Sequence, residues 1–319
     1  MKIPVLSPQN AEQLLQGHIA AHLTSWRVLK ASGDGLRDYL QGQLTQDMTR
    51  LKPEQGIHAC LLTAQGKAVS ELFIIEAGGD ELILLAPSHV AVECVARLRQ
   101  FSLGYRLRIG IVESMSVFSL QGAKAAAQLT ELNLPEPDGA WLASSRDAAG
   151  QVFALRSMQG QTQACWLIGE AASLGTRLGA LVGEDQAEAL RIIHGMPRFA
   201  TEWDSRLHPL NANLIEFDGV SFDKGCYVGQ EVTSRMNWRG GIKKKLYRVQ
   251  LAEMQAEESP PLPWPVLSTQ HVGEIRSAAC DAAGRCFGIA LLPTATADAG
   301  TALHLEQGEA VMILEPCHA

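Results

Sequence analysis

The segment from Phe222 to Glu231 concentrates the residue types that can do chemistry. It reads Phe-Asp-Lys-Gly-Cys-Tyr-Val-Gly-Gln-Glu. Glycines on both sides of the Cys-Tyr-Val triplet favour a sharp turn or a positive φ, so we expect the thiol of Cys226 at a bend. Lys224 is predicted to favour the thiolate by placing a positive charge nearby. The segment therefore predicts a functional thiol; the alternative is a structural turn with an incidental cysteine.

A basic segment follows the cysteine directly. It carries Trp238 and Arg239 and then three consecutive lysines, Lys243, Lys244 and Lys245. The whole chain has a formal net charge of −7, which argues against broad, sequence-independent nucleic-acid binding because such binding needs a positive surface. Two interpretations stay open for the segment: a solvated linker, or a surface that binds RNA or another anion such as a polyglutamate tail.

The bulk composition is that of an ordinary globular chain. Its 319 residues are enough for two or three domains. No apolar run approaches the length of a membrane span, and the N-terminal residues form no signal-peptide core, so we expect a cytoplasmic protein without membrane association. Seven cysteines, an odd number without CxxC spacing, predict reduced thiols instead of a disulfide framework or a zinc site.

The elements that must position these residues are mixed helices and strands. Apolar runs bounded by turn residues predict strands at 26–30, 57–62, 68–76, 81–85, 105–112, 115–120, 141–145, 151–157 and 162–168. Helices are predicted at 123–132, 171–182 and 185–194, and Asp34 and Ser88 are predicted to cap two others. From 195 to 241 the pattern is that of loops, and about six short strands after Leu246 predict a small barrel or sandwich.

The cysteine segment resembles a family signature. Residues 224–231 match the Lys-Gly-Cys-aromatic-x-Gly-Gln-Glu string of the YgfZ family, folate-binding relatives of the glycine-cleavage T-protein that are linked to tRNA modification and iron–sulfur enzyme maintenance. Three further segments resemble the family in the same order, at 39–47, 63–67 and 209–222.

This resemblance implies an α+β protein with the three-lobed fold of the aminomethyltransferase T-protein and a C-terminal β-barrel. The lobes it implies are an N-terminal folate-binding-like lobe at 1–120, a second lobe with the Lys-Gly-Cys motif at 121–244, and the barrel at 245–319. In such proteins the lobes form a ring around a folate-sized hole.

The resemblance also implies a cofactor, tetrahydrofolate or a derivative. Trp26 stands where the family offers an aromatic wall, and the remaining cofactor-side residues belong to the motif: Gly225, Tyr227, Gly229, Gln230 and Glu231. The chain departs from the family at Ile193, which replaces a glutamate that grips the pterin. Isoleucine accepts no hydrogen bond, so the donor edge of the pterin needs another partner. Glu188 and Glu202 are near in sequence, and His194 is a further candidate, although a lone histidine at a helix end is more often a cap or a surface residue.

Three functions stay open. The leading one is an accessory protein for iron–sulfur enzymes such as tRNA methylthiotransferases, with Cys226 as a transient iron ligand, a sulfur carrier or a redox-sensitive thiol and no resident metal. The second is a folate-dependent, aminomethyltransferase-like enzyme; Gln230, where T-proteins have arginine, counts against it. The third is direct binding of tRNA by the 235–248 segment.

Overall fold

The computed structural model describes residues 3–139, 141–157, 164–252, 254 and 260–319. The chain divides into two compact units. Unit 1 combines Met1–Glu12, Asp185–Phe217 and Thr233–Ala319, and unit 2 combines Gln13–Glu184 and Asp218–Val232. The cysteine segment is thus part of unit 2, together with a sheet formed by residues far from it in sequence. The lobe boundaries at 120 and 244 stay a prediction.

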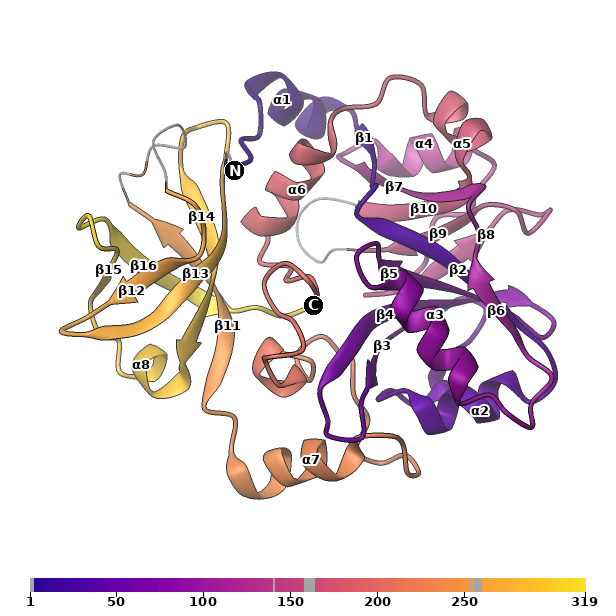
Figure 1. Ribbon diagram of the computed structural model, residues 1–319. Helices are drawn as coiled ribbons and strands as arrows, with labels where there is room; N and C mark the ends of the chain where they lie inside the picture. Colours follow the sequence, from indigo (N-terminus) through magenta and orange to yellow (C-terminus); the bar gives the residue numbers. More distant parts are fainter. Residues whose placement is uncertain (1–2, 140, 158–163, 253, 255–259) are drawn as a thin grey trace. The chain divides into compact units, whose positions relative to one another are not determined.

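The first sheet of unit 2 is antiparallel, with strand order β3-β4-β5-β2-β6. Its strands are β2 (Trp26–Ser32), β3 (Ile57–Leu62), β4 (Ala68–Gly78), β5 (Glu81–Pro87) and β6 (Arg108–Ile111). Helices α2 (Leu36–Gln43) and α3 (Ala91–Gln100) lie beside it (Figure 1). Their apolar residues share one core cluster with the sheet, including Leu29, Leu40, Leu72, Leu84 and Leu98. Because β3 is buried along its whole length, its apolar run has no polar alternation.

The second sheet of unit 2 has the order β1-β7-β10-β9-β8. Its strands are β1 (Ile19–His22), β7 (Met115–Gln121), β8 (Ser144–Arg146), β9 (Phe153–Arg156) and β10 (Ala164–Glu170). Helices α4 (Ala125–Glu131) and α5 (Ala171–Leu178) contribute Leu129 and Leu174 to its core. Helix α1 (Pro8–Gln16) precedes β1 in the chain; the sequence patterns did not predict either element.

Unit 1 contains a closed barrel with strand order β11-β14-β13-β12-β15-β16 (orange and yellow in Figure 1). The strands are β11 (Lys244–Leu251), β12 (Trp264–Leu267), β13 (His271–Cys280), β14 (Cys286–Pro293), β15 (Leu303–His304) and β16 (Ala310–Pro316), with the short helix α8 (Thr294–Asp298) after β14. Val249, Val266 and Ile275 are fully buried in its core. The predicted small C-terminal barrel is therefore confirmed.

The remaining elements of unit 1 precede the barrel. Helix α6 (Glu184–Ile193) confirms the helix predicted at 185–194, and a 3-10 turn follows at Pro209–Ala212. Buried Asn213 ties this turn to the barrel, because its Nδ2 donates to the carbonyl O of Leu246 at 2.9 Å and of Cys317 at 2.7 Å. The 230–240 region, predicted as loop, is helical: α7 spans Gln230–Arg235 and a π-helical turn spans Met236–Gly240.

Two predicted helix caps are wrong. Gly35, with a left-handed φ of 75°, occupies the N-cap of α2, and Asp34 stands one residue too early to reach the free amides. Val90 occupies the N-cap of α3 because a turn from Pro87 to Val90 separates Ser88 from the helix.

The expectation of reduced thiols is wrong for one pair. Cys280 and Cys286 form a disulfide, with Cα atoms 4.0 Å apart, where β13 and β14 face each other. Spacing of six residues brings two thiols together only when the chain between them turns as a hairpin, which the Cys pattern does not reveal. Within the described residues, no helix combines the length and apolar character that crossing a membrane requires.

Candidate functional site

The loop that carries the cysteine lies against the segment from Gln41 to Asp47 in unit 2. Several hydrogen bonds join them, among them Val228 N to Gly42 O at 3.1 Å, Ser221 N to Thr45 O at 3.0 Å, and Thr45 Oγ1 to Gly219 O at 2.6 Å. Asp218, at the start of the loop, also pairs with both nitrogens of the Arg50 fork at 2.8 and 2.7 Å. Segments about 180 residues apart in sequence thus form one site.

Lys224 fixes the middle of this loop. Its ammonium donates to three backbone carbonyls, those of Gln41 at 2.7 Å and of Leu44 and Gln46 at 2.8 Å. Burial lowers the pKa of Lys224 to about 8, and the nearby Asp47 carboxylate opposes that shift. The side chain therefore anchors the loop through its own donors, while its predicted effect on the thiol stays a prediction.

Cys226 differs from the other free cysteines by being exposed, in a stretch without helix or strand. The other four are buried, and burial raises the pKa of Cys94 to about 12 and of Cys165 to about 11. Burial also raises the pKa of Cys60 and of Cys317 well above its usual value. Cys226 is thus the accessible free thiol of the chain; the bend expected at this residue lies just before it, at residues 222–224.

The two glycines of the motif have different roles. Gly229 has a φ of 84°, and a Cβ there would stand 2.6 Å from the carbonyl O of Thr63. Gly66, with a φ of 73°, faces it closely, since the Cα of Gly66 would stand 3.2 Å from that Cβ. The turn at 63–67 therefore packs on the cysteine segment. Gly225 has open space around it and no positive φ.

The rest of the motif continues into α7. Tyr227 is buried, its ring centroid lies 5.2 Å from the Lys224 ammonium, and its carbonyl accepts a hydrogen bond from the amide of Gln230 at 3.2 Å. Glu231 follows as an exposed residue in the first turn of α7. The motif residues are thus together, but their assignment to a cofactor stays a prediction.

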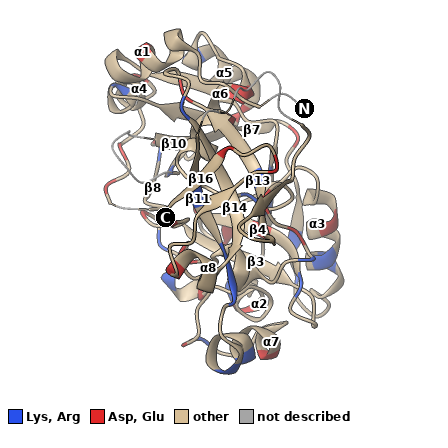
Figure 2. Ribbon diagram, turned by 90° about the vertical axis from the view of Figure 1, so that its left-hand side faces the viewer, with Lys and Arg blue, Asp and Glu red and all other residues tan. Residues whose placement is uncertain are grey.

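The basic segment is mostly exposed. Trp238 is 73% exposed, and Arg239, Lys243 and Lys244 are exposed as well. Lys245 differs from them because it pairs with Glu216. Figure 2 shows basic residues in blue on α7 and at the start of β11.

Trp26 belongs to an aromatic cluster between the two sheets of unit 2. It is 5% exposed, and its ring centroid lies 5.5 Å from that of Phe73 on β4 and 5.0 Å from that of Trp166 on β10. Phe73 and Trp166 meet edge to face at 4.9 Å. His58 on β3 stacks on Phe73 at 4.7 Å. Trp26 is therefore a packed core residue, and its ligand role stays a prediction.

A buried acid–base pair adjoins this cluster. His58 Nε2 lies 3.1 Å from Glu71 Oε1, and both side chains are at most 5% exposed. Sequence reasoning missed both residues, although a carboxylate inside the apolar run of β4 was a usable signal, since buried carboxylates are rare unless paired. Within the described parts of the chain, no group of three or more His, Cys, Asp or Glu side chains is arranged to hold a metal ion.

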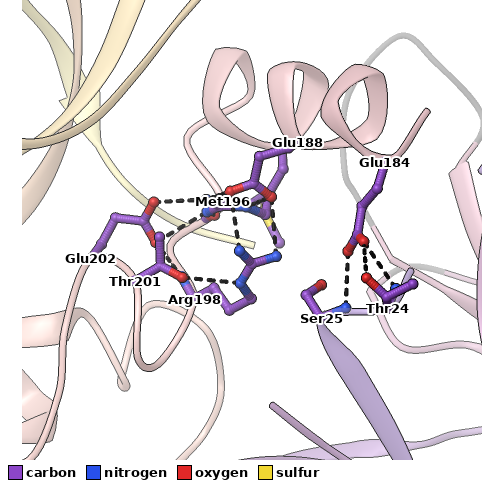
Figure 3. A network of polar contacts seen from close by, with 9 residues as sticks. Thr24, Ser25, Glu184, Glu188, Met196, Arg198, Thr201 and Glu202 are labelled. Atoms are coloured by element: carbon purple, nitrogen blue, oxygen red, sulfur yellow. Dashed lines mark hydrogen bonds and ion pairs between the residues drawn. The ribbon is translucent and has the colours of Figure 1, made fainter. Parts of the chain in front are cut away.

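The carboxylates near Ile193 are already paired within unit 1 (Figure 3). Arg191 donates to Glu188 at 2.6 and 3.0 Å and to Glu202 at 2.7 and 3.1 Å. Arg198 donates to Glu188 from both guanidinium ends at 3.0 and 3.1 Å. Burial raises the pKa of Glu188, but the two arginines outweigh it and lower the pKa to about 2. Neither carboxylate offers unused oxygens for a pterin.

Comparisons with known proteins agree with this architecture. No family model matches the chain. It is 28% identical over 231 residues to the tRNA-modifying protein YgfZ of Klebsiella pneumoniae, covering 70% of this chain and 69% of that protein. For the protein of the same name from Edwardsiella ictaluri the identity is 29% over 230 residues, covering 70% and 69%.

Among solved structures, the glycine cleavage system aminomethyltransferase T of Bartonella henselae superposes with a TM-score of 0.82 at 16% identity, covering 99% of this chain and 90% of that one. The predicted α+β, aminomethyltransferase-like fold with a C-terminal barrel is therefore confirmed.

Proposed function

Because this chain is a relative of the YgfZ proteins, we propose that it is an accessory protein of tRNA modification. In this proposal it supports iron–sulfur enzymes such as the tRNA methylthiotransferases, and Cys226 is its working thiol. One observation carries the proposal: an exposed cysteine stands on a loop held by buried hydrogen bonds, while the other free thiols are buried.

The proposed chemistry is ligation of iron by the Cys226 thiolate while a cluster is in transit. Thiolates are the usual ligands of iron–sulfur clusters, and four are normally needed. One exposed cysteine supplies one ligand, so the client enzyme supplies the others and the cluster is cargo. An anchored loop supports this role because it holds the thiol outward without a rearrangement of the core.

Complementation of a bacterium that lacks its own YgfZ gene tests this proposal. We expect the wild-type chain to restore methylthiolated tRNA and Cys226→Ala to lose most of that activity at equal protein abundance. Asp223→Asn, an exposed change three residues away, is the matched control and should keep the activity. Equal rescue by Cys226→Ala and wild type would remove the thiol from the mechanism.

We also propose that unit 2 binds tetrahydrofolate or a derivative. The proposed site uses residues of this chain: Trp26, Phe73 and Trp166 supply aromatic side chains, and Glu71 supplies a buried carboxylate that would exchange its contact with His58 for hydrogen bonds from a pterin. Glu71 would replace the glutamate that is missing at residue 193. Bound folate would supply the one-carbon chemistry of its ring nitrogens.

Calorimetric titration with tetrahydrofolate tests the second proposal. Glu71→Gln keeps the size of the side chain and removes its charge, and we expect an affinity loss of about tenfold or more, because hydrogen bonds to charged groups contribute about 1.5–3 kcal/mol. Glu76→Gln, on the same strand but only half-buried, should bind as the wild type does. Unchanged affinity of Glu71→Gln would exclude this carboxylate as the folate partner.

Direct binding of tRNA is the second candidate function. The exposed Trp238 beside the exposed Arg239, Lys243 and Lys244 favours it, since aromatic rings can stack on bases while cations contact phosphates.

A further inference from the structure

Unit 1 contains a cavity of about 680 Å³ that lies outside the cysteine segment. Five parts of unit 1 form its wall: the N-terminal residues Ile3 and Pro4, helix α6, the loop at 200–206, the pair Leu262 and Pro263, and strand β13. Cavities of a few hundred Å³ with mixed walls are typical of small-molecule sites. The cavity is therefore large enough for a metabolite-sized ligand.

A bulge in β13 brings two polar neighbours to this wall. The pairing with β14 shifts between Ile275 and Ser277, so Arg276 is an extra residue on the bulged strand. Successive side chains of a regular strand point to opposite faces, whereas a bulge re-aims one of them. As a result, Arg276 and Ser277 both line the cavity although they are adjacent in sequence.

Both residues have a donor without a partner. Ser277 is 4% exposed, and its Oγ has no hydrogen-bond partner among the residues that the structure describes. The same is true of Arg276 Nε, although the other nitrogens of that guanidinium contact Glu274 and the carbonyl O of Glu202. A buried polar atom without a partner costs free energy, so two such donors on adjacent residues of the cavity wall indicate an acceptor supplied by a ligand.

The carboxylates of the wall do not compete for such a ligand. Glu188 is paired with two arginines, and Glu274 is paired with Arg276. Arg206, also in the wall, donates to Asp204 at 2.9 and 2.6 Å. Because these ion pairs are formed, the polar groups of the wall that stay available to a ligand are the hydrogen-bond donors Arg276 Nε and Ser277 Oγ. The rest of the wall is apolar, with Ile3, Ile192, Leu262 and Ala278 among its residues.

We propose that this cavity binds a small molecule with an apolar body and a carboxylate group. The carboxylate accepts hydrogen bonds from Arg276 Nε and Ser277 Oγ, and the body packs on the apolar part of the wall. The charge-assisted hydrogen bonds between arginine and a carboxylate are stronger than those between arginine and a neutral carbonyl. This ligand is separate from the folate and from the thiol chemistry proposed above.

Benzoate is a suitable probe because it is planar, apolar and anionic, and benzamide is its neutral counterpart of similar shape. We expect benzoate to bind the full-length protein in ligand-observed NMR titrations and benzamide to bind at least tenfold more weakly. Ser277→Ala removes one donor and Arg276→Lys removes Nε, and each should weaken benzoate about tenfold, as loss of one bond to a charged group does. Arg285→Lys, 65% exposed in the same hairpin, should leave the affinity unchanged.

Melting temperatures separate a folding defect from a binding defect. Ser277→Ala deletes a hydroxyl without a partner, so the free variant should melt at the wild-type temperature or above. Benzoate should raise the melting temperature of the wild type and of Arg285→Lys more than that of Ser277→Ala. The proposal is overturned if benzoate does not bind, if both variants keep wild-type affinity, or if benzamide binds equally well. Inorganic phosphate that binds where benzoate does not would also overturn the assignment of a carboxylate.

Discussion

Lys224 and Cys226 stand two residues apart in opposite surroundings. The lysine is buried and uses its ammonium to bind three carbonyls, whereas the cysteine is exposed. The sequence alone suggests that the lysine acts on the thiol. The contacts add a different role, in which the lysine holds the backbone so that the thiol stays at the surface. None of the three acceptors of Lys224 could be predicted from the motif, because they lie about 180 residues earlier in the chain.

Thiol labelling tests the difference between Cys226 and the buried cysteines. We expect iodoacetamide to modify Cys226 of the folded protein at least tenfold faster than Cys60 or Cys94, because the buried thiols are shielded and their raised pKa values leave little thiolate. Peptide mass spectrometry at several time points gives the rates. Cys226→Ser should leave the folded protein almost unlabelled, and fast labelling of that variant would show that another thiol is accessible.

Glu188 gives a second residue-scale prediction. Its pKa is about 2 in the folded protein, against a usual value of 4.5, so its stabilising contribution is present above about pH 4.5 and is lost as the pH falls toward 2. Removing one partner of a buried ion pair costs about 3–5 kcal/mol. We therefore expect Glu188→Gln to lower the free energy of unfolding by that order at pH 7 and by much less near pH 2.

Chemical denaturation at several pH values measures this effect. The exposed Glu131→Gln is the control and should change stability little at any pH. A loss for Glu188→Gln that is the same at pH 7 and near pH 2 would mean that its charge is not what stabilises unit 1.

At the scale of elements, apolar runs bounded by turn residues were enough to predict β3 and β4, because strands carry that pattern locally. The series of about six short strands after Leu246 was enough to predict the barrel. The helical stretch at 230–240 was not predictable in the same way, since its residues have no apolar periodicity. The disulfide and the bulge at Arg276 depend on strand register, which the sequence does not reveal. The same holds for the aromatic cluster, which joins β2 and β4 to β10.

The close contact between the turn at 63–67 and Gly229 of the cysteine segment leads to a prediction about how these two loops pack. In Gly229→Ala the new Cβ would stand 2.6 Å from the carbonyl O of Thr63, at a φ of 84° that side chains rarely adopt. We expect a loss of about 1–3 kcal/mol in stability, the usual cost of backbone strain of this kind, together with faster amide exchange at Val228. Gly225→Ala, in open space four residues earlier, is the matched control and should change little. Equal effects of the two changes, by denaturation and hydrogen exchange, would refute the role of the close contact.

At the scale of the whole molecule, charge limits what the chain can bind. A net charge of −7 opposes general attraction to nucleic acid, so any tRNA affinity must come from a local surface. Composition alone predicts this limit, and the exposure of Trp238, Lys243 and Lys244 identifies one such surface. Long-range repulsion and local attraction differ in how the binding constant depends on salt concentration. Only local phosphate contacts release counterions in proportion to their number.

The salt dependence of tRNA binding separates the two effects. The combined change Lys243→Gln and Lys244→Gln should weaken binding and reduce the slope of log K against log salt by about 1.4–1.8, since each phosphate contact contributes about 0.7–0.9. The pair Lys52→Gln and Lys124→Gln, exposed elsewhere, changes the net charge by the same amount and should leave the slope unchanged. Fluorescence anisotropy with labelled tRNA over a range of salt concentrations measures both. If the two double variants lose affinity equally, binding follows net charge alone, and the segment at 235–248 is a solvated linker.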